Sequence, residues 1–301
     1  MARLFQEYLT YLAGEKNASA HTITAYRKDL EDYFAYLAER GMAETDADHL
    51  TIRRYLAVLR DRGISKNSVA RKMSSLRSYY RFLIRENVLA DNPLTLVSTP
   101  KETKKLPKFV HYEDIRSLLA LPDNSPAGLR DSAIMELLYG GGLRVSELCG
   151  LTLDRLNLSV RSVRVLGKGT KERIVPLGEP AAAALAEYLE KGRPALVKPE
   201  RAEETGVFLN RRNGGALTTR AVRDILDKYV NRLSATLKVS PHMLRHSYAT
   251  HMLENGADIR IIQELLGHER LSTTQIYTHI TKSRMMEIYR ETHPRGQEKE
   301  N

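Results

Sequence analysis

The sequence of 301 residues contains one cysteine, no tryptophan and no apolar run long enough to span a bilayer. The single thiol, Cys149, cannot form an intrachain disulfide, which fits a reducing compartment. The N-terminal stretch carries Glu7 inside its apolar pattern and has no small-residue cleavage site, so we expect no signal peptide. We therefore expect a cytoplasmic protein without a membrane segment, in which Cys149 is a small core residue and not a nucleophile.

Motifs for metal-dependent and nucleotide-dependent chemistry are also missing. No Walker-type phosphate loop occurs, and no cluster of carboxylates suits a pair of metal ions. His242 and His246 are spaced as in zinc proteases, but the glutamate that should follow the first histidine is absent. We expect no metal and no other cofactor, and we expect His246 and His251 to be structural.

The charge balance favours a polyanionic partner. There are 47 Lys and Arg against 37 Asp and Glu, a formal net charge of +10. Residues 1–50 are net acidic, whereas the basic residues concentrate between Arg53 and Arg85, where Asp61 is the single acid. A solvated helix face is the alternative, but a basic stripe on an amphipathic helix favours a DNA backbone. The side chains expected to contact DNA there are Arg71, Lys72, Arg77, Arg81 and Arg85.

Two domains joined by a linker are predicted. Residues 1–97 show four apolar stripes with the 3.6-residue period of amphipathic helices, typical of a four-helix module. Residues 98–108 hold prolines and lysines and are typical of an extended linker. We expect Lys104 and Lys105 to follow DNA phosphates as the chain passes between the domains.

Residues 109–290 are predicted to form a second domain, mainly helical with a small β-sheet (α+β). Two short strands are expected within residues 161–177, around a turn that carries Lys168, and a short buried strand at residues 207–209. The polar residues 291–301 are expected to be disordered.

The segment from Ser240 onward is the part of the chain most suited to chemistry. Ser240 is a favourable N-cap and Pro241 suits the first helical position. His242 and Arg245 then share one face of the first turn, where free N–H groups and the helix dipole favour a phosphate. A guanidinium matches phosphate oxygens, and an imidazole moves protons near neutral pH.

Other candidate groups stand near the ends of predicted helices. A second apolar-patterned helix ends before His268, and Tyr277 follows nine residues later. A glycine triplet at residues 140–142 precedes Arg144, and Glu147 is close enough in sequence to brace that arginine. A phenol is a recognised covalent nucleophile, so the set suits attack by Tyr277 on a phosphodiester.

Four sequence blocks resemble the signature blocks of the tyrosine site-specific recombinases, and within them the bacterial Xer type (the XerC/XerD group). The blocks are GLRVSELCGL, LGKGTKERIVPL, SPHMLRHSYATHMLENGAD and QELLGHERLSTTQIYTH. The resemblance runs nearly end to end. It implies two domains that form a clamp around DNA, and metal- and ATP-independent recombination through a 3′-phosphotyrosyl intermediate. It also implies the resolution of chromosome or plasmid dimers at a dif-like site before cell division.

The resemblance further implies a role for each candidate residue. Tyr277 is the nucleophile that becomes linked to the 3′-phosphate. Arg144 and Arg245 bind the non-bridging oxygens of the scissile phosphate, and His268 adds a hydrogen bond to the same charge. His242 assists proton transfer at the tyrosine.

Lys168 is implied to protonate the leaving 5′-hydroxyl. The implied partners are double-stranded DNA and a homo- or hetero-tetramer assembled on two DNA sites, with activation by a septal DNA translocase as a further expectation. We also expect the apolar face of residues 282–290 to dock on a neighbouring protomer.

Three alternatives remain open. A phage or transposon integrase, or a type IB topoisomerase, would share the chemistry, although integrases often carry an arm-binding domain before the helical module, which here begins at about residue 2. A regulator that binds DNA without catalysis would not need Tyr277, Arg144 and Arg245 together, and all three are present.

Overall fold

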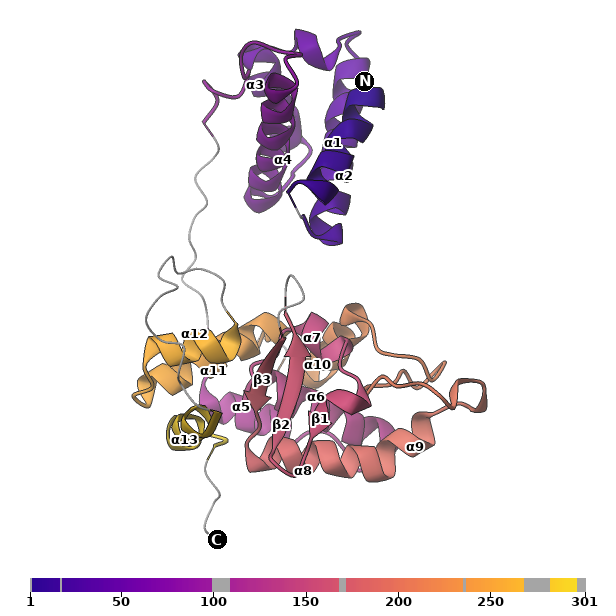
Figure 1. Ribbon diagram of the computed structural model, residues 1–301, viewed down its shortest axis with the longest axis vertical. Helices are drawn as coiled ribbons and strands as arrows, with labels where there is room; N and C mark the ends of the chain where they lie inside the picture. Colours follow the sequence, from indigo (N-terminus) through magenta and orange to yellow (C-terminus); the bar gives the residue numbers. More distant parts are fainter. Residues whose placement is uncertain are drawn as a thin grey trace. The chain divides into compact units, whose positions relative to one another are not determined.

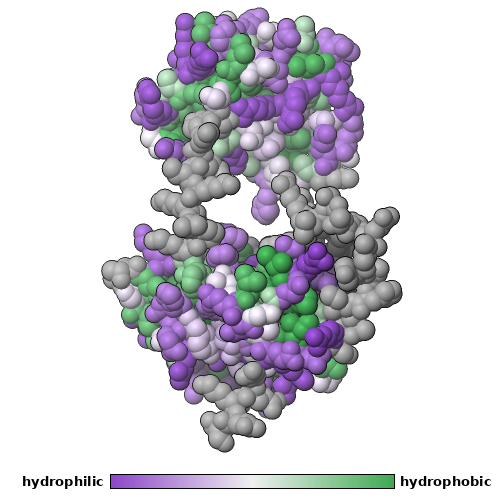
Figure 2. Space-filling model, turned by 90° about the vertical axis from the view of Figure 1, so that its left-hand side faces the viewer, coloured by the Kyte–Doolittle hydropathy of each residue, from purple (hydrophilic) through white to green (hydrophobic). Residues whose placement is uncertain are grey.

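The computed structural model describes residues 2–16, 18–98, 109–167, 172–234, 237–267 and 282–296. The chain divides into two compact units, Met1–Lys105 and Leu106–Asn301, called here the N-terminal unit and the C-terminal unit (Figure 1). No helix in the described ranges combines the length and the apolar character that a bilayer crossing requires. On the face seen in Figure 2, hydrophilic residues cover much of each unit, and smaller hydrophobic areas are interspersed among them.

The N-terminal unit is the four-helix module that the apolar periodicity predicts. Side chains of Ser19, Asp48 and Ser65 accept backbone N–H groups at the starts of three of the helices, which satisfies donors that have no intrahelical partner. The helices are α1 (Ala2–Gly14), α2 (Ala20–Ala38), α3 (His49–Asp61) and α4 (Lys66–Arg85).

Tyrosines occupy much of the core of this unit. The hydroxyls of Tyr33 and Tyr80 lie 2.9 Å apart, and the Tyr80 hydroxyl also donates to the backbone oxygen of Glu44 at 3.0 Å. Tyr55 donates to Asp32 Oδ2 at 3.0 Å. Most buried phenols have such partners, and these bonds connect α2 to α3 and α4, and α4 to the segment before α3.

The C-terminal unit is helical around a small antiparallel sheet, as predicted. The sheet has the order β1-β2-β3, with β1 (Leu156–Asn157), β2 (Ser162–Leu166) and β3 (Glu172–Pro176). Figure 1 shows α12 and α13 beside the edge strand β3, which both helices contact. The helices are α5 (Tyr112–Leu119), α6 (Pro126–Gly140), α7 (Val145–Cys149), α8 (Glu179–Glu187), α9 (Arg193–Leu196), α10 (Thr219–Leu233), α11 (Pro241–Glu254), α12 (Ile259–Leu266) and α13 (Lys282–Thr292).

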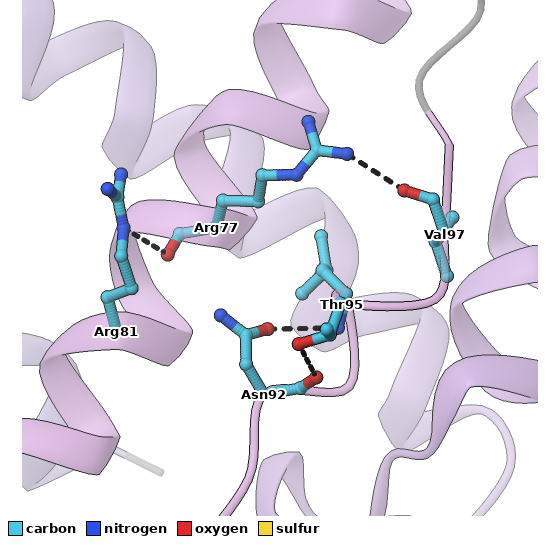
Figure 3. A pocket seen from close by; sticks show the side chains of 6 residues that line it. Arg77, Arg81, Asn92, Thr95 and Val97 are labelled. Carbon is cyan, nitrogen blue, oxygen red and sulfur yellow. Dashed lines mark hydrogen bonds between the residues drawn. The ribbon is translucent and has the colours of Figure 1, made fainter.

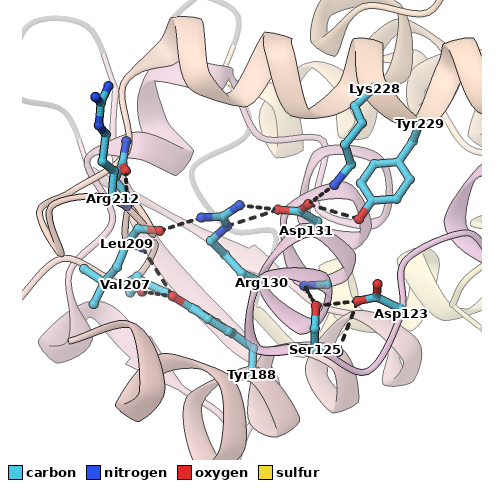
Figure 4. Close-up of polar contacts among 12 residues, drawn as sticks. Asp123, Ser125, Arg130, Asp131, Tyr188, Val207, Leu209, Arg212, Lys228 and Tyr229 are labelled. Carbon is cyan, nitrogen blue, oxygen red and sulfur yellow. Dashed lines mark hydrogen bonds and ion pairs between the residues drawn. The ribbon is translucent and has the colours of Figure 1, made fainter. Parts of the chain in front are cut away.

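A buried charge network fixes α6 in the middle of this unit. Asp131 Oδ1 accepts from Arg130 Nε and Nη2 at 3.0 and 2.7 Å, and Asp131 Oδ2 accepts from Lys228 and Tyr229 of α10 at 2.9 and 3.0 Å (Figure 4). Arg130 Nη1 also donates to the backbone oxygen of Leu209 at 2.9 Å. Every oxygen of the buried carboxylate is thus satisfied, which buried charges require. The network holds α6 to α10 and to the segment around residue 209.

The prediction of a strand at residues 207–209 is wrong. The segment is buried, but it forms only isolated bridges, Thr152 to Gly206 and Leu209 to Ala216. Its backbone groups bond separate partners. The N–H of Val207 donates to the oxygen of Leu151 and the oxygen of Phe208 accepts from the N–H of Leu217, both at 2.9 Å. The Tyr188 hydroxyl donates to the oxygen of Val207 at 3.1 Å and accepts from the N–H of Leu209 at 3.3 Å. In a run of three apolar residues, the pattern does not distinguish a β-strand from a buried segment without strand pairing.

The prediction of disorder from residue 291 is wrong for residues 291–296; residues 297–301 lie outside the described part of the chain. α13 continues to Thr292, and the buried ring of His293 stacks on Tyr289 with ring centroids 4.9 Å apart. Arg295 forms an ion pair with Glu136 of α6. Composition counts His and Arg as polar, but here both find partners inside the unit.

Helix α13 packs on its own C-terminal unit. Ile288 and Tyr289 are buried in one cluster with Tyr248. The Tyr289 hydroxyl donates to the oxygen of Gly140 at 2.8 Å and accepts from the N–H of Gly178 at 3.2 Å. Two residues of the face that we expected to dock on a neighbouring protomer, Ile288 and Tyr289, are therefore covered within this chain, whereas Met285 and Met286 are half-buried.

Candidate active site

The glycine triplet after α6 positions Arg144. Gly142 has a φ of +57°, in the left-handed region that favours glycine. A Cβ at this position would also lie 3.0 Å from Leu266 Cδ2 and 3.1 Å from Tyr248 Cδ1. The chain then enters α7 with Arg144 as its N-cap, and the Arg144 N–H donates to Glu147 Oε2 at 2.8 Å. The predicted bracing of Arg144 by Glu147 is thus present in the structure.

Glu147 is the shared partner of three arginines. Its Oε1 accepts from Arg144 Nη1 and from Arg173 Nη1, both at 2.7 Å, and its Oε2 accepts from Arg173 Nη2 at 2.9 Å. Arg245 Nη1 lies 3.8 Å from the same Oε2. We call these four residues the arginine cluster. It sets three positive charges against one carboxylate, so it has an excess of positive charge.

The C-terminal end of α12 supplies further acceptors to the cluster. The last carbonyls of a helix have no intrahelical partner, and the helix dipole makes this end negative, so cations are favoured there. Three consecutive backbone oxygens each accept from one guanidinium: Leu265 from Arg173 Nε at 3.0 Å, Leu266 from Arg245 Nη2, and Gly267 from Arg144 Nη2 at 2.9 Å.

Gly267 ends α12 in the left-handed conformation, with a φ of +64°. A Cβ there would lie 3.1 Å from Cδ of Arg173 and 3.3 Å from its Nη1. Both the backbone and the neighbouring arginine therefore favour glycine at this position.

The arginines differ in their exposure. Arg245 is buried, and it also donates from Nη1 to the oxygen of Gly142. Burial, followed by the charge of Arg144, lowers the pKa of Arg245 to about 10, so it remains protonated at neutral pH. The side chain of Arg144 is 39% exposed, whereas that of Glu147 is 3% exposed. Burial alone would raise the pKa of Glu147, but hydrogen bonds from Arg173 and Arg144 outweigh it and lower that pKa, so the carboxylate stays charged.

Helix α11 begins as its sequence predicts. The Ser240 side chain accepts from the N–H of Met243 at 3.2 Å, and Pro241 is the first helical residue. His242 is exposed on the first turn, three residues before Arg245. The structure therefore brings Arg144 and Arg245 together around Glu147, with His242 one turn from Arg245. The other predicted catalytic residues lie outside the described residues: Lys168, His268 and Tyr277.

Comparison with known proteins identifies the family. A model described as "Phage integrase family" matches residues 108–284, and one described as "Phage integrase, N-terminal SAM-like domain" matches residues 5–87. The chain is 47% identical over 293 residues to the tyrosine recombinase XerC of Halalkalibacterium halodurans, with 96% of each chain covered. It is 45% identical over 297 residues to XerC of Listeria innocua, with 98% of each covered. This chain belongs to the tyrosine recombinases.

Two solved structures share the fold of this chain. The XerH site-specific recombinase bound to a palindromic difH substrate matches with a TM-score of 0.71 and 24% identity, over 90% of this chain and 80% of that one. The Tn1549 transposon integrase in complex with circular intermediate DNA matches with a TM-score of 0.70 and 20% identity, over 93% and 97%. The chain is thus an enzyme of the tyrosine recombinase class, with a SAM-like helical domain and a catalytic domain.

Sequence reasoning missed Arg173 in this tyrosine recombinase. Arg173 is on β3, where side chains two apart share a face, and Val175 on that face is buried. The available signal was an arginine on the buried face of a predicted strand, inside the block LGKGTKERIVPL. A buried arginine needs an anionic or carbonyl partner, but nothing in the sequence shows that the partner is Glu147.

The structure pairs several of the basic residues predicted to contact DNA in the N-terminal unit. Arg71 forms an ion pair with the buried Asp29, and Lys72 lies 3.5 Å from Asp29 Oδ1 and 2.7 Å from Asp32 Oδ2. Lys72 is itself buried. A DNA phosphate would have to displace these carboxylates from Arg71 and Lys72. Contact of these two side chains with DNA stays a prediction.

Arg85, at the end of α4, is also paired with an acidic residue. Arg85 bonds both carboxylate oxygens of Glu15, at 2.6 and 3.0 Å, and its guanidinium lies 4.8 Å from the centre of the Tyr11 ring. Lys104 and Lys105 lie outside the described residues.

Arg77 and Arg81 line a pocket of about 290 Å³ beside the turn that follows α4 (Figure 3). Arg77 Nη2 donates to the oxygen of Val97 at 2.9 Å, and Arg81 Nε donates to the oxygen of Arg77 at 3.2 Å. Within the described part of the N-terminal unit, no carboxylate forms an ion pair with Arg81, which is exposed. Of the basic side chains predicted on α4, Arg81 is therefore the one best placed to take an external anion.

Proposed function

We propose that this recombinase cuts and rejoins double-stranded DNA through a covalent bond between Tyr277 and a 3′-phosphate. The arginine cluster is the observation that carries the proposal. Three guanidiniums converge on one carboxylate, so the site has an excess of positive charge before any ligand binds. The excess suits one phosphodiester, whose oxygens Arg144 and Arg245 would bind.

The chemistry follows from that charge. In-line attack by the phenol gathers negative charge on the equatorial oxygens of the phosphorus, and fixed guanidiniums stabilise this charge without reorganising. One phosphoester replaces another, so the step needs no ATP. We assign proton transfer at the phenol to His242, a hydrogen bond to the phosphate to His268, and protonation of the leaving 5′-hydroxyl to Lys168, all by resemblance.

A nicked suicide substrate tests the nucleophile. With wild-type protein, loss of the short strand next to the nick should trap a covalent protein–DNA adduct. The Tyr277→Phe variant should bind the same DNA with unchanged affinity and form no adduct. The matched control is Tyr112→Phe, which removes a phenol from the same unit and should leave adduct formation intact. If Tyr277→Phe forms the adduct at the wild-type rate, the assignment of the nucleophile fails.

We infer that the biological substrate is a chromosome or plasmid dimer, resolved at a dif-like site in the cytoplasm before cell division. The relatives named XerC, which match over nearly their whole length, support this choice. Two duplexes exchange strands at four phosphates, so we propose a tetramer on two sites, made of this chain alone or with a paralogue. Activation by a septal DNA translocase belongs to the same proposal.

Footprinting on genomic DNA tests this biological role. A single protected site in the region where replication ends is the expected result. Protection only at the end of an integrated element would instead favour an integrase.

A further inference from the structure

We propose that Arg173 is a positioning residue of the recombination reaction: it occupies both oxygens of Glu147 and thereby keeps the guanidiniums of Arg144 and Arg245 available to the phosphate. The inference rests on the proposed function of the arginine cluster. It gives a role to Arg173, which is not among the residues to which the family resemblance assigns one.

The hydrogen bonds of Arg173 separate it from the other two arginines. Its Nη1 and Nη2 bond the two oxygens of Glu147 at 2.7 and 2.9 Å, and its Nε bonds the oxygen of Leu265 at 3.0 Å. All three nitrogens of this guanidinium bond protein acceptors, two of them in the planar geometry that suits a carboxylate. Among the described residues, the side-chain hydrogen bonds of Arg144 and Arg245 to protein acceptors involve Nη1 and Nη2 only. Arg173 is therefore not placed to be a catalytic residue, since it is committed before DNA binds.

Arg173 limits how strongly Arg144 and Arg245 bond Glu147, because one carboxylate has few acceptor sites. Arg144 makes a single side-chain bond to Glu147, and Arg245 stays 3.8 Å from Oε2. Without Arg173, Glu147 would keep its charge and lose its bidentate partner. The nearest replacements are Arg245 and Arg144, whose N–H groups would turn toward Glu147 and away from the phosphate. Arg173 therefore competes with Arg144 and Arg245 for Glu147 and leaves their N–H groups free to bind the phosphate.

A double-mutant cycle tests the competition, with adduct formation on the suicide substrate measured at saturating DNA. Arg173→Gln should slow adduct formation about 10²-fold, the loss typical of a displaced transition-state donor. Adding Glu147→Gln removes the competing charge, so the double variant should be at least about tenfold faster than Arg173→Gln alone. Glu147→Gln alone completes the cycle. A double variant as slow as Arg173→Gln, or slower, overturns the proposal.

Further measurements separate positioning from a role in folding. Arg173→Gln should lower the melting temperature, because the buried carboxylate of Glu147 loses a bidentate partner, so the rate constant is measured per folded molecule, well below the unfolding temperature. The dissociation constant for DNA should stay near the wild-type value while this rate constant falls. If the rate per folded molecule is unchanged, Arg173 is merely structural and the proposal fails. Arg173→Lys is the second variant: one ammonium cannot bond both Glu147 oxygens and Leu265 in the fork geometry, so it should be nearly as slow as Arg173→Gln. A wild-type rate for Arg173→Lys contradicts the bidentate role.

Arg164 provides the matched control on the neighbouring strand β2. Its side chain is 51% exposed and its guanidinium lies 3.9 Å from Glu172, so Arg164→Gln removes the same charge without touching Glu147. Its rate should stay within about twofold of wild type. Failure of the proposed function would be visible separately, because wild-type protein would then form no adduct that depends on Tyr277.

Discussion

In the N-terminal unit, Arg85 bonds both oxygens of Glu15, and in the C-terminal unit three arginines divide one carboxylate among them. The first arrangement is close to neutral, whereas the second keeps a positive charge, because Glu147 is the one carboxylate among the described residues that pairs with these arginines. The sequence is more basic around α4 than around the cluster, so the count of basic residues alone would rank the two regions in the opposite order. What decides the capacity for an external anion is how many acids the fold brings to each base.

The largest expected effect concerns two buried arginines of the C-terminal unit, Arg245 and Arg130. Arg245→Gln should slow adduct formation by about 10² to 10³-fold, because it removes a fixed donor to the transition state. Arg130→Gln should lower the melting temperature and leave the rate per folded molecule unchanged, since Arg130 bonds Asp131 and the oxygen of Leu209. Single-turnover adduct assays and thermal unfolding measure both. Equal losses of rate in the two variants would contradict the assignment of Arg245, and not Arg130, to the reaction.

The next effect is on stability. Asp131→Asn should lower the free energy of unfolding by about 3 kcal/mol, because it breaks a buried ion pair with Arg130 and weakens the bond to Lys228. The control is Asp61→Asn, whose exposed partner Arg60 lies 3.4 Å away and whose loss should change stability by less than about 1 kcal/mol. Urea unfolding followed by circular dichroism gives both values. A loss below about 1 kcal/mol for Asp131→Asn would show that the network is not held by this carboxylate.

The smallest effect lies in DNA affinity. Arg81→Gln should weaken binding and reduce the slope of log affinity against log salt by about one, as expected for one phosphate contact. Arg85→Gln should change affinity less, because a phosphate must first displace Glu15 from Arg85. Titration of a labelled duplex at several salt concentrations measures both slopes. A larger loss for Arg85→Gln would mean that the Glu15 pair opens on DNA.

Local rules predicted much of the fold and part of the site. Ser240 and Pro241 start α11 where their residue types favour it, and the three-residue spacing of Arg144 and Glu147 predicted their contact. These inferences succeeded because each depends on neighbours within one helical turn.

Contacts between distant segments were not predictable in this way. Arg173 meets Glu147 across 26 positions of the chain, and Arg295 meets Glu136 across 159. A periodic pattern states which face of an element is buried, but not which charged group on another element it will meet. The prediction of a strand at residues 207–209 was wrong for a related reason: a short apolar run indicates that the segment is buried, but not that it pairs with another strand.

The hydroxyl of Tyr289 joins the ends of two segments, the glycine triplet that precedes Arg144 and the turn before α8, through Gly140 and Gly178. A shortened chain that stops before α13 would leave both backbone groups without this partner and would expose the ring of Tyr248, which packs against Tyr289 and His293, to water. Truncation is therefore a poor way to ask what the end of this recombinase does to its neighbours. Single substitutions on the solvent side of the helix leave the interior intact and give the cleaner answer.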